Sequence, residues 1–95
     1  MAANFKIHTD THTEGPRLKL TGDFDGNSAL EVVHLLETYA KFSDKIFVDT
    51  DGLQHIYEFG KAVFEDACSD LQEIRSGSTQ LIFSGNEISL QPTGL

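Results

Sequence analysis

Basic side chains are scarce in this chain. Its 95 residues include seven Lys and Arg against fifteen Asp and Glu, so the formal net charge is −8. An acidic surface repels phosphate backbones and anionic lipid headgroups. We therefore expect no nucleic-acid partner and no docking on anionic membranes. A Walker-type phosphate loop is also missing from the sequence.

Cysteine and long apolar runs are equally scarce. Cys68 is the single cysteine, which excludes an intramolecular disulfide and fits a reducing compartment. The first residues lack the charged-then-apolar run of a signal peptide, and no apolar stretch is long enough to span a bilayer. With 39% apolar residues the chain can build one hydrophobic core. We expect one cytoplasmic domain over residues 1–95, without membrane insertion.

The first 42 residues carry a hairpin pattern followed by a helix pattern. Alternation predicts strands at 4–9 and 17–21 around a turn at 14–16, and it directs Leu18 and Leu20 toward the core. A break at 22–26 precedes a helix over 28–42, which Asn27 or Ser28 can cap. The apolar face of this helix consists of Ala29, Val32, Val33, Leu36, Tyr39 and Ala40.

The rest of the chain repeats a strand–helix–strand order. Three consecutive apolar residues at 46–48 predict a strand covered on both faces, ending at Asp49. A helix over 59–75 follows, with Gly77 as its C-terminal cap. Residues 81–83 predict the last buried strand, and residues 87–90 a short edge piece. Parallel crossovers and the opening hairpin together predict an α/β fold: a mixed sheet of four to five strands with helices packed largely on one face.

Two segments carry a resemblance to a known family. Residues 46–60 read Ile-Phe-Val-Asp-Thr-Asp-Gly-Leu-Gln-His-Ile-Tyr-Glu-Phe-Gly, and residues 20–25 read Leu-Thr-Gly-Asp-Phe-Asp. An apolar strand ending in Asp, a loop and a helix that opens at a glycine resemble the STAS domain, the fold of bacterial anti-sigma factor antagonists. That family places Asp-Ser-Ser before the helix glycine, and its serine is the phosphorylated switch. Here Tyr57, Glu58 and Phe59 occupy those places before Gly60.

The resemblance implies a protein–protein docking module without enzymatic activity or cofactor. It implies a partner such as an anti-sigma factor or an ATPase-type regulator, and leaves the oligomeric state open. The expected docking surface consists of Tyr57, Glu58, Phe59, Gly60 and Lys61, with Asp23 and Asp25 beside it. Because residue 59 has no hydroxyl, we expect no phosphorylation there, and none of Thr50, Tyr57, Ser69 and Ser76 matches the switch position. An alternative interpretation is that Glu58 merely favours the helix N-terminus and Phe59 packs into the core.

Two other functions remain open at this point. Similar small STAS domains serve as cytoplasmic subunits of lipid-transport ABC complexes, which also work by docking. Alternatively, an enzyme could bind Mg²⁺ or a nucleotide through an aspartate cluster, because carboxylates at the ends of parallel strands meet at one edge of a sheet. The candidates for that cluster are Asp23, Asp25, Asp49 and Asp51. Loop and capping aspartates are the plainer interpretation.

Three further motifs have a plain structural interpretation as well. Residues 48–53 resemble the Asp-x-Asp-Gly-Thr start of haloacid-dehalogenase-type phosphatases, but lack the threonine and leave too little chain for that family's later motifs. Alternate residues His8, Asp10, His12 and Glu14 could chelate a metal, although a solvated hairpin face is expected. Cys68 lies beside the apolar helix stripe and is expected to be a small core residue.

Overall fold

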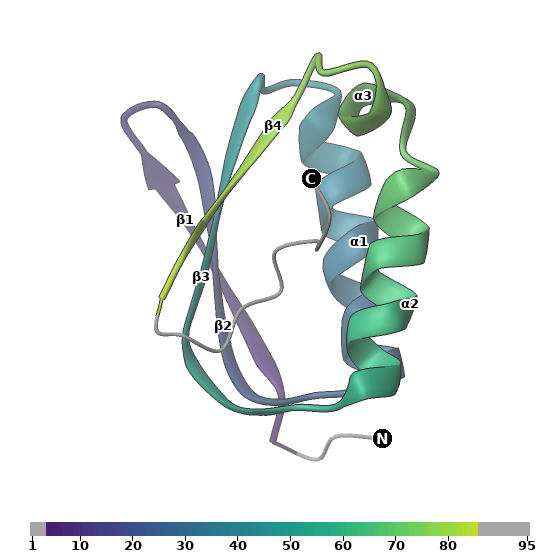
Figure 1. The fold of residues 1–95 in the computed structure, drawn as a ribbon. Helices are drawn as coiled ribbons and strands as arrows, with labels where there is room; N and C mark the ends of the chain where they lie inside the picture. The colour runs from purple at the N-terminus through teal and green to yellow at the C-terminus, as the bar shows by residue number, and fades with distance from the viewer. Residues whose placement is uncertain (1–3, 86–95) are drawn as a thin grey trace.

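A mixed sheet carries both long helices on one of its faces (Figure 1). The structure is a computed structural model that describes residues 4–85. The described elements are β1 (Lys6–His12), β2 (Gly15–Phe24), α1 (Gly26–Ala40), β3 (Lys45–Ile56), α2 (Glu58–Ser69), α3 (Gln72–Arg75) and β4 (Gln80–Ser84). The four described strands lie in the order β1-β2-β3-β4. This arrangement confirms the predicted α/β class and mixed sheet.

The opening hairpin forms as predicted. Strands β1 and β2 pair antiparallel, and Leu18 and Leu20 are fully buried. The predicted break at 22–26 is wrong over Gly22–Phe24, because β2 continues to Phe24. Gly22 has a φ of 91°, and a Cβ at this position would collide with the Asn4 carbonyl. A glycine here therefore lets the strand continue with a shifted register instead of ending it.

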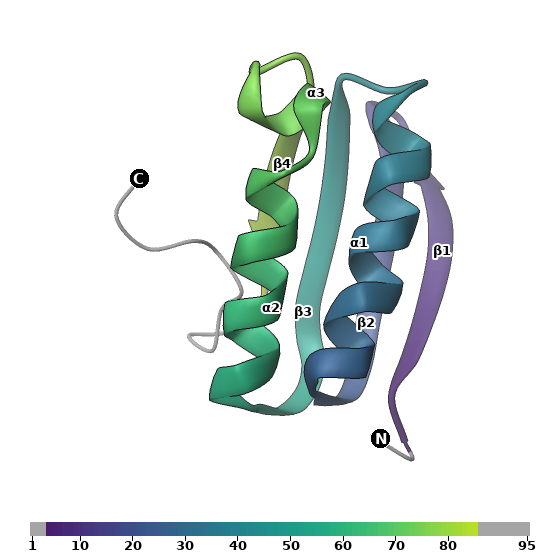
Figure 2. The same cartoon turned by 90° about the vertical axis from the view of Figure 1, so that its right-hand side faces the viewer.

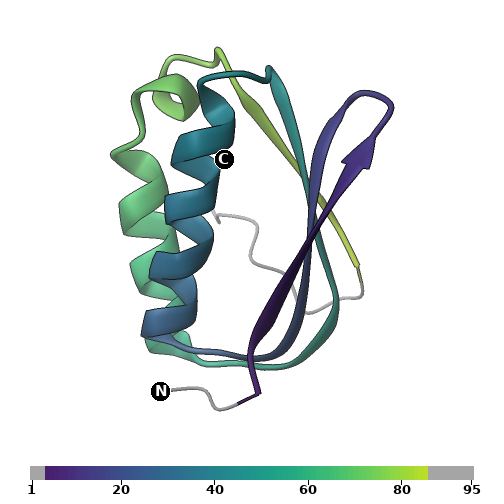
Figure 3. The ribbon, with the colours of Figure 1, turned by 180° about the vertical axis from the view of Figure 1, so that it is seen from behind.

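The two crossovers are parallel, as predicted. Strand β3 pairs parallel with β2 on one side and with β4 on the other. In Figure 2, α1 lies toward the β1 side of the sheet and α2 toward the β4 side. The view from behind in Figure 3 places β1 at the outside of the sheet.

Strand β3 is longer than predicted. Its predicted end at Asp49 is wrong, because the strand runs on to Ile56. Asp and Gly at 49–52 are poor strand formers, but the ladder with β2 continues through Leu53 and Ile56, and Leu53 is buried. Tertiary pairing and burial thus override the local turn signal.

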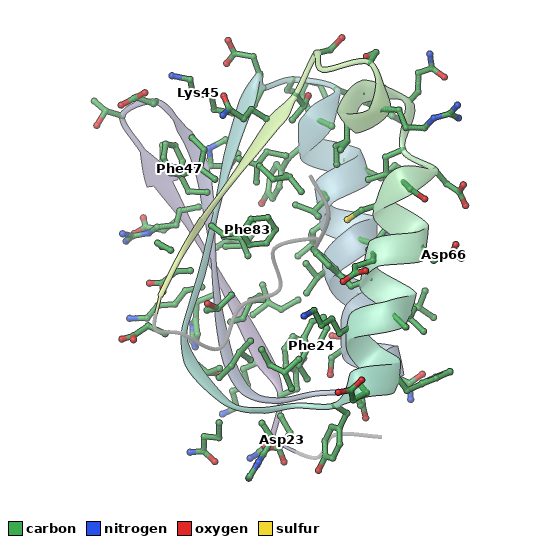
Figure 4. The ribbon with its side chains drawn as sticks, viewed as in Figure 1. Asp23, Phe24, Lys45, Phe47, Asp66 and Phe83 are labelled. Atoms are coloured by element: carbon green, nitrogen blue, oxygen red, sulfur yellow. The ribbon has the colours of Figure 1, made fainter. Side chains whose placement is uncertain are left out.

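The core lies between the sheet and the two long helices (Figure 4). Three phenylalanine rings connect the layers: Phe64 of α2 meets Phe24 edge-to-face at 5.9 Å and Phe83 at 6.2 Å between ring centroids. Such edge-to-face pairs add to the energy of area burial. Cys68 is also buried, which confirms its predicted place in the core. The remaining fully buried large side chains are Leu18, Leu20, Val32, Leu36, Ile46 and Val48.

Three predictions about the chain from residue 46 onward are corrected by the structure. The predicted helix over 59–75 is interrupted: α2 ends at Ser69, Leu71 is extended and buried, and the short α3 follows. Gly77, with a φ of 81°, ends α3 as predicted. The described helices cover one face of the sheet, so Phe47 is only half-buried on the other. Strand β4 is half-buried where a buried strand was predicted, and residues 87–90 lie outside the described residues.

Candidate docking site at the helix N-termini

The N-termini of α1 and α2 meet at one end of the molecule, where β2 and β3 also end (Figure 1). Tyr57 N–H donates to the Phe24 carbonyl at 3.0 Å, which fixes the end of β3 against the end of β2. Gly60 packs so closely on the backbone of Asp25 that a Cβ on residue 60 would lie 2.7 Å from the Asp25 carbonyl carbon. Backbone contacts therefore hold the two helix starts in a fixed relation.

Asp25 caps α1. Its Oδ1 accepts hydrogen bonds from the backbone N–H and from the hydroxyl of Ser28, both at 2.9 Å. The bond from the Ser28 N–H is the main reason that the pKa of Asp25 lies below its ordinary value. The prediction that Asn27 or Ser28 caps the helix is wrong, because α1 begins at Gly26. Aspartate is itself a preferred N-cap residue. The glycines on either side of it led to the interpretation of residues 22–26 as a break, and so to a cap placed too late in the chain.

The start of α2 is built differently. Tyr57 is its N-cap, and within residues 4–85 its side chain makes no capping hydrogen bond. Glu58 lies in the first turn, where a negative charge interacts favourably with the partial positive charge of the helix end. Phe59 is 73% exposed and Tyr57 52% exposed. The alternative that Phe59 packs into the core is therefore wrong.

We call Tyr57, Glu58, Phe59, Gly60 and Lys61 the α2 N-terminal surface. The ring of Phe59 lies against the first turn of α1, since a Cβ on Gly26 would come within 2.8 Å of it. The ring of Tyr57 lies near that of His55, with centroids 6.4 Å apart. Asp23 is opposite His55 in the β2–β3 ladder, and Figure 4 places it at this end of the sheet. The structure thus brings the seven residues predicted for docking to one end of the molecule.

Asp23 has a buried carboxylate oxygen. Its Oδ1 is buried without a hydrogen-bond partner within residues 4–85. A buried carboxylate oxygen without a partner is costly. A hydrogen-bond donor that reached this buried oxygen would remove that cost.

The aspartate cluster proposed for an enzyme does not form. Asp49 lies within β3 between Lys19 of β2 and Ser84 of β4, and its Oδ1 accepts the Asp51 N–H at 3.0 Å. Asp23, in contrast, pairs with His55 further along the same strand. This alternative is excluded because β3 continues past Asp49, which removes Asp49 and Asp51 from the strand end. Within residues 4–85, no three His, Cys, Asp or Glu side chains are grouped to hold a metal.

The phosphatase-like segment at 48–53 also lies inside β3, and not in a loop after a strand. It pairs with β2 through Val48, Asp49, Gly52 and Leu53, whereas its described pairing with β4 ends at Asp49. Asp10 and Glu14 of the hairpin are exposed and form ion pairs with Arg17 at 2.7 Å and with Lys45 at 3.0 Å. Lys45 Nζ donates to Glu14 Oε1, and this bond is the main reason that the pKa of Lys45 is raised. The side chain of His12 lies outside the described part of the structure.

Cys68 is the one described cysteine, and burial raises its thiol pKa to about 12. A thiol with that pKa is not a nucleophile at neutral pH. None of the described helices is long and apolar enough to cross a membrane.

Comparison of the whole chain with known proteins gives matches at the level of structure. Neither a protein-family model nor a curated protein matches the sequence. The anti-sigma factor antagonist SpoIIAA, in its unphosphorylated form, superposes on 83% of this chain with a TM-score of 0.58 at 14% identity, over 70% of its own length. The fold is STAS-like.

Two further solved structures superpose on this chain. An uncharacterised protein with a SpoIIAA-like fold from Shewanella loihica matches over 93% of this chain and 92% of its own, with a TM-score of 0.54 at 15% identity. Mglu matches with a TM-score of 0.68 at 12% identity over 84% of this chain. The present chain spans 19% of that Mglu chain, about a fifth.

Proposed function

We propose that this chain is a non-enzymatic, cytoplasmic regulatory module that resembles an anti-sigma factor antagonist. In this proposal residues 1–95 act as a single STAS-like domain that binds a protein partner through the α2 N-terminal surface, with Asp23 and Asp25 at its margin. The observation that carries the proposal is the exposure of Phe59, 73% open to solvent at the position where the STAS family has its switch serine.

Exposed aromatic residues at a fixed backbone position are suited to anchor a protein interface. Aromatic side chains dominate the binding energy of many interfaces when they enter a pocket of the partner. Phe59 and Tyr57 are both more than half exposed, and the close packing of Gly60 on Asp25 holds their backbone in place. A preformed surface of this kind loses little conformational entropy on binding.

The charge around these aromatics indicates what kind of partner fits. Glu58 is exposed, and Asp23 and Asp25 are half-buried. These three carboxylates compare with one cation, Lys61, among the seven residues of the proposed interface. Interface charges are usually complementary. We therefore expect a partner with an apolar pocket and a basic rim. The STAS resemblance implies that this partner is an anti-sigma factor or an ATPase-type regulator.

The missing hydroxyl has a regulatory consequence. Phosphorylation adds a charge of about −1.5 to −2 to a helix N-terminus and so changes which partner binds there. Phe59 cannot accept phosphate, and Glu58 supplies a permanent negative charge beside it. The docking surface is therefore permanently in one state. After incubation with the partner and ATP, intact mass and peptide mapping should find no phosphate on residues 57–61, and a phosphate there would contradict the unswitched surface.

The binding proposal can be tested by capture from a lysate of the source organism. Wild type, Phe59→Ala and Glu58→Lys are immobilised, with Phe42→Ala and Glu37→Lys as matched controls. Phe42 is 81% exposed but follows the opposite end of α1, and Glu37 is an exposed glutamate on the same helix. We expect the partner to be lost from the first two variants and retained by the controls. Equal capture by all five proteins would contradict the assignment of the surface.

The captured protein also distinguishes the two docking functions. A sigma-regulatory ATPase or anti-sigma factor would support the proposed regulatory role. A component of a lipid-transport ABC complex would assign the same surface to the alternative role.

A further inference from the structure

The outer side of β1 forms an exposed edge of the sheet. Strand β1 lies at one end of the sheet order, and within residues 4–85 no other strand pairs with its outer side. Its seven residues contain no Pro, which would block pairing by removing a backbone N–H. An edge of this kind is a template for a further strand.

The direction of the backbone groups on β1 follows from one hydrogen bond. The hydroxyl of Thr21 on β2 donates to the Lys6 carbonyl at 3.5 Å, so the polar backbone groups of Lys6 point toward β2. These groups alternate along a strand, and those of Ile7 and Thr9 therefore point outward. The N–H of Thr11 is already bonded to Asp10 Oδ1 at 2.7 Å, which limits the open part of the edge to its first half.

We propose that the partner of this edge is a second copy of the chain, paired antiparallel about a two-fold axis at His8. In this register Ile7 lies opposite Thr9 of the second copy, and both have outward-pointing backbone groups. Lys6 lies opposite Asp10 of the second copy, so each dimer contains two cross-strand pairs of opposite charge, which stabilise antiparallel strands. Moving the axis to Ile7 or Thr9 removes both Lys–Asp pairs.

Asp10 can take part in this contact together with its existing partner. Its Oδ2 accepts a bond from Arg17 on β2, and the side chain remains 59% exposed. A carboxylate has about four acceptor positions, so a second cation can approach from the outer side.

An apolar groove beside β1 fits the same arrangement. A shallow pocket of about 560 Å³ lies between β1 and α1, lined by Ile7, Leu30, Glu31, His34 and Leu35. Leu30 is 55% exposed there. A two-fold axis perpendicular to the sheet keeps the helices of both copies on the same face. The grooves of the two copies then face each other across the β1–β1 contact and cover Leu30.

A charge-swap experiment tests both the partner and the register. Lys6→Asp and Asp10→Lys each place like charges opposite each other, and we expect each variant alone to self-associate about tenfold more weakly than wild type. Mixing the two variants restores both opposite-charge pairs, so a heterodimer should form at wild-type concentrations. Sedimentation velocity over a concentration series measures the self-association of each variant and the association of the mixture. Lys41→Glu and Asp70→Lys, exposed charge reversals away from β1, serve as controls and should dimerise as wild type does.

Thermal unfolding of each variant establishes that the monomers fold, since Asp10→Lys also removes the ion pair with Arg17. Thr9→Pro provides a second test, because it removes an outward N–H and leaves the bonds to β2 intact, and it should abolish the dimer. A wild type that is monomeric at millimolar concentration would overturn the proposal. So would a dimer that is insensitive to the charge swaps, or a mixture that does not recover. None of these outcomes bears on the α2 N-terminal surface, which lies on a different part of the molecule.

Discussion

The two long helices begin side by side at the same end of the molecule, yet their first turns are built differently. At the start of α1, Asp25 accepts two hydrogen bonds from Ser28, which satisfies a helix N–H group within the chain. At the start of α2, Tyr57 makes no side-chain capping bond within residues 4–85, and Phe59 is largely exposed. The first terminus therefore contributes to folding, whereas the second leaves polar and aromatic groups available to a partner.

The largest loss of stability is expected from a substitution in the core beneath the two helix starts. Phe64 of α2 is fully buried between Phe24 and Phe83. Phe64→Ala removes these contacts and leaves a cavity, so we expect it to lower the free energy of unfolding by about 3–5 kcal/mol. Urea denaturation followed by circular dichroism measures the change, with the exposed Phe42→Ala as the control. A loss similar to that of the control would show that the ring cluster does not hold α2 on the sheet.

A smaller loss of stability is expected from a substitution at the contact between the two helix starts. Alanine usually stabilises a helix by about 1 kcal/mol relative to glycine. A methyl on Gly60, however, would meet the backbone of Asp25, which cannot move away as a side chain can. We expect Gly60→Ala to lower the free energy of unfolding by about 1–3 kcal/mol.

Gly26→Ala is the matched control for this contact, because it adds the same methyl to the first turn of α1. The added methyl would meet the ring of Phe59, which can swing aside, so stability should change little. If both variants were equally stable to urea, the helix starts would not be in fixed contact.

The cap of α1 should make stability depend on acid. The pKa of Asp25 is lowered in the folded protein, so its ionised form stabilises the fold at neutral pH. That contribution is fully present above the ordinary carboxyl pKa and is lost as the pH falls through the lowered folded pKa. Asp25→Ala should lower the melting temperature at pH 7 by several degrees. The melting temperature of this variant should also decrease less than that of wild type as the pH is lowered. Asp25→Asn, which can still cap, should remain close to wild type at pH 7, and a fall like that of alanine would contradict the capping role.

The same comparison shows what could be predicted from the sequence. Strong periodic signals gave the right answer: Leu18 and Leu20 alternate in β2, and the stripe containing Val32 and Leu36 faces the core. The STAS resemblance correctly predicted the fold and the meeting of residues 57–61 with Asp23 and Asp25 at one end. These features follow from local patterns and from element order.

The failures concern features that depend on tertiary pairing. Strand β3 extends beyond Asp49 because β2 offers it a continuing ladder, and no local residue pattern contains that information. The same extension separated Asp49 from Asp23 and removed the predicted metal cluster. The exposure of Phe59 also could not be predicted from the sequence, because an aromatic residue in the first turn of a helix can lie either in the core or on the surface.

The smallest effect on stability is expected at the residue with the largest proposed role in binding. Phe59 is 73% exposed, and its described contact is with the first turn of α1 at Gly26. Phe59→Ala should therefore change the free energy of unfolding by less than about 0.5 kcal/mol, as is usual for surface substitutions. The same variant should lose the partner that wild type captures. A loss of stability approaching that of Phe64→Ala would instead assign Phe59 to the packing of the two helix starts. An unchanged stability with lost binding would separate the two termini by function, with α1 capped for the fold and α2 open for docking.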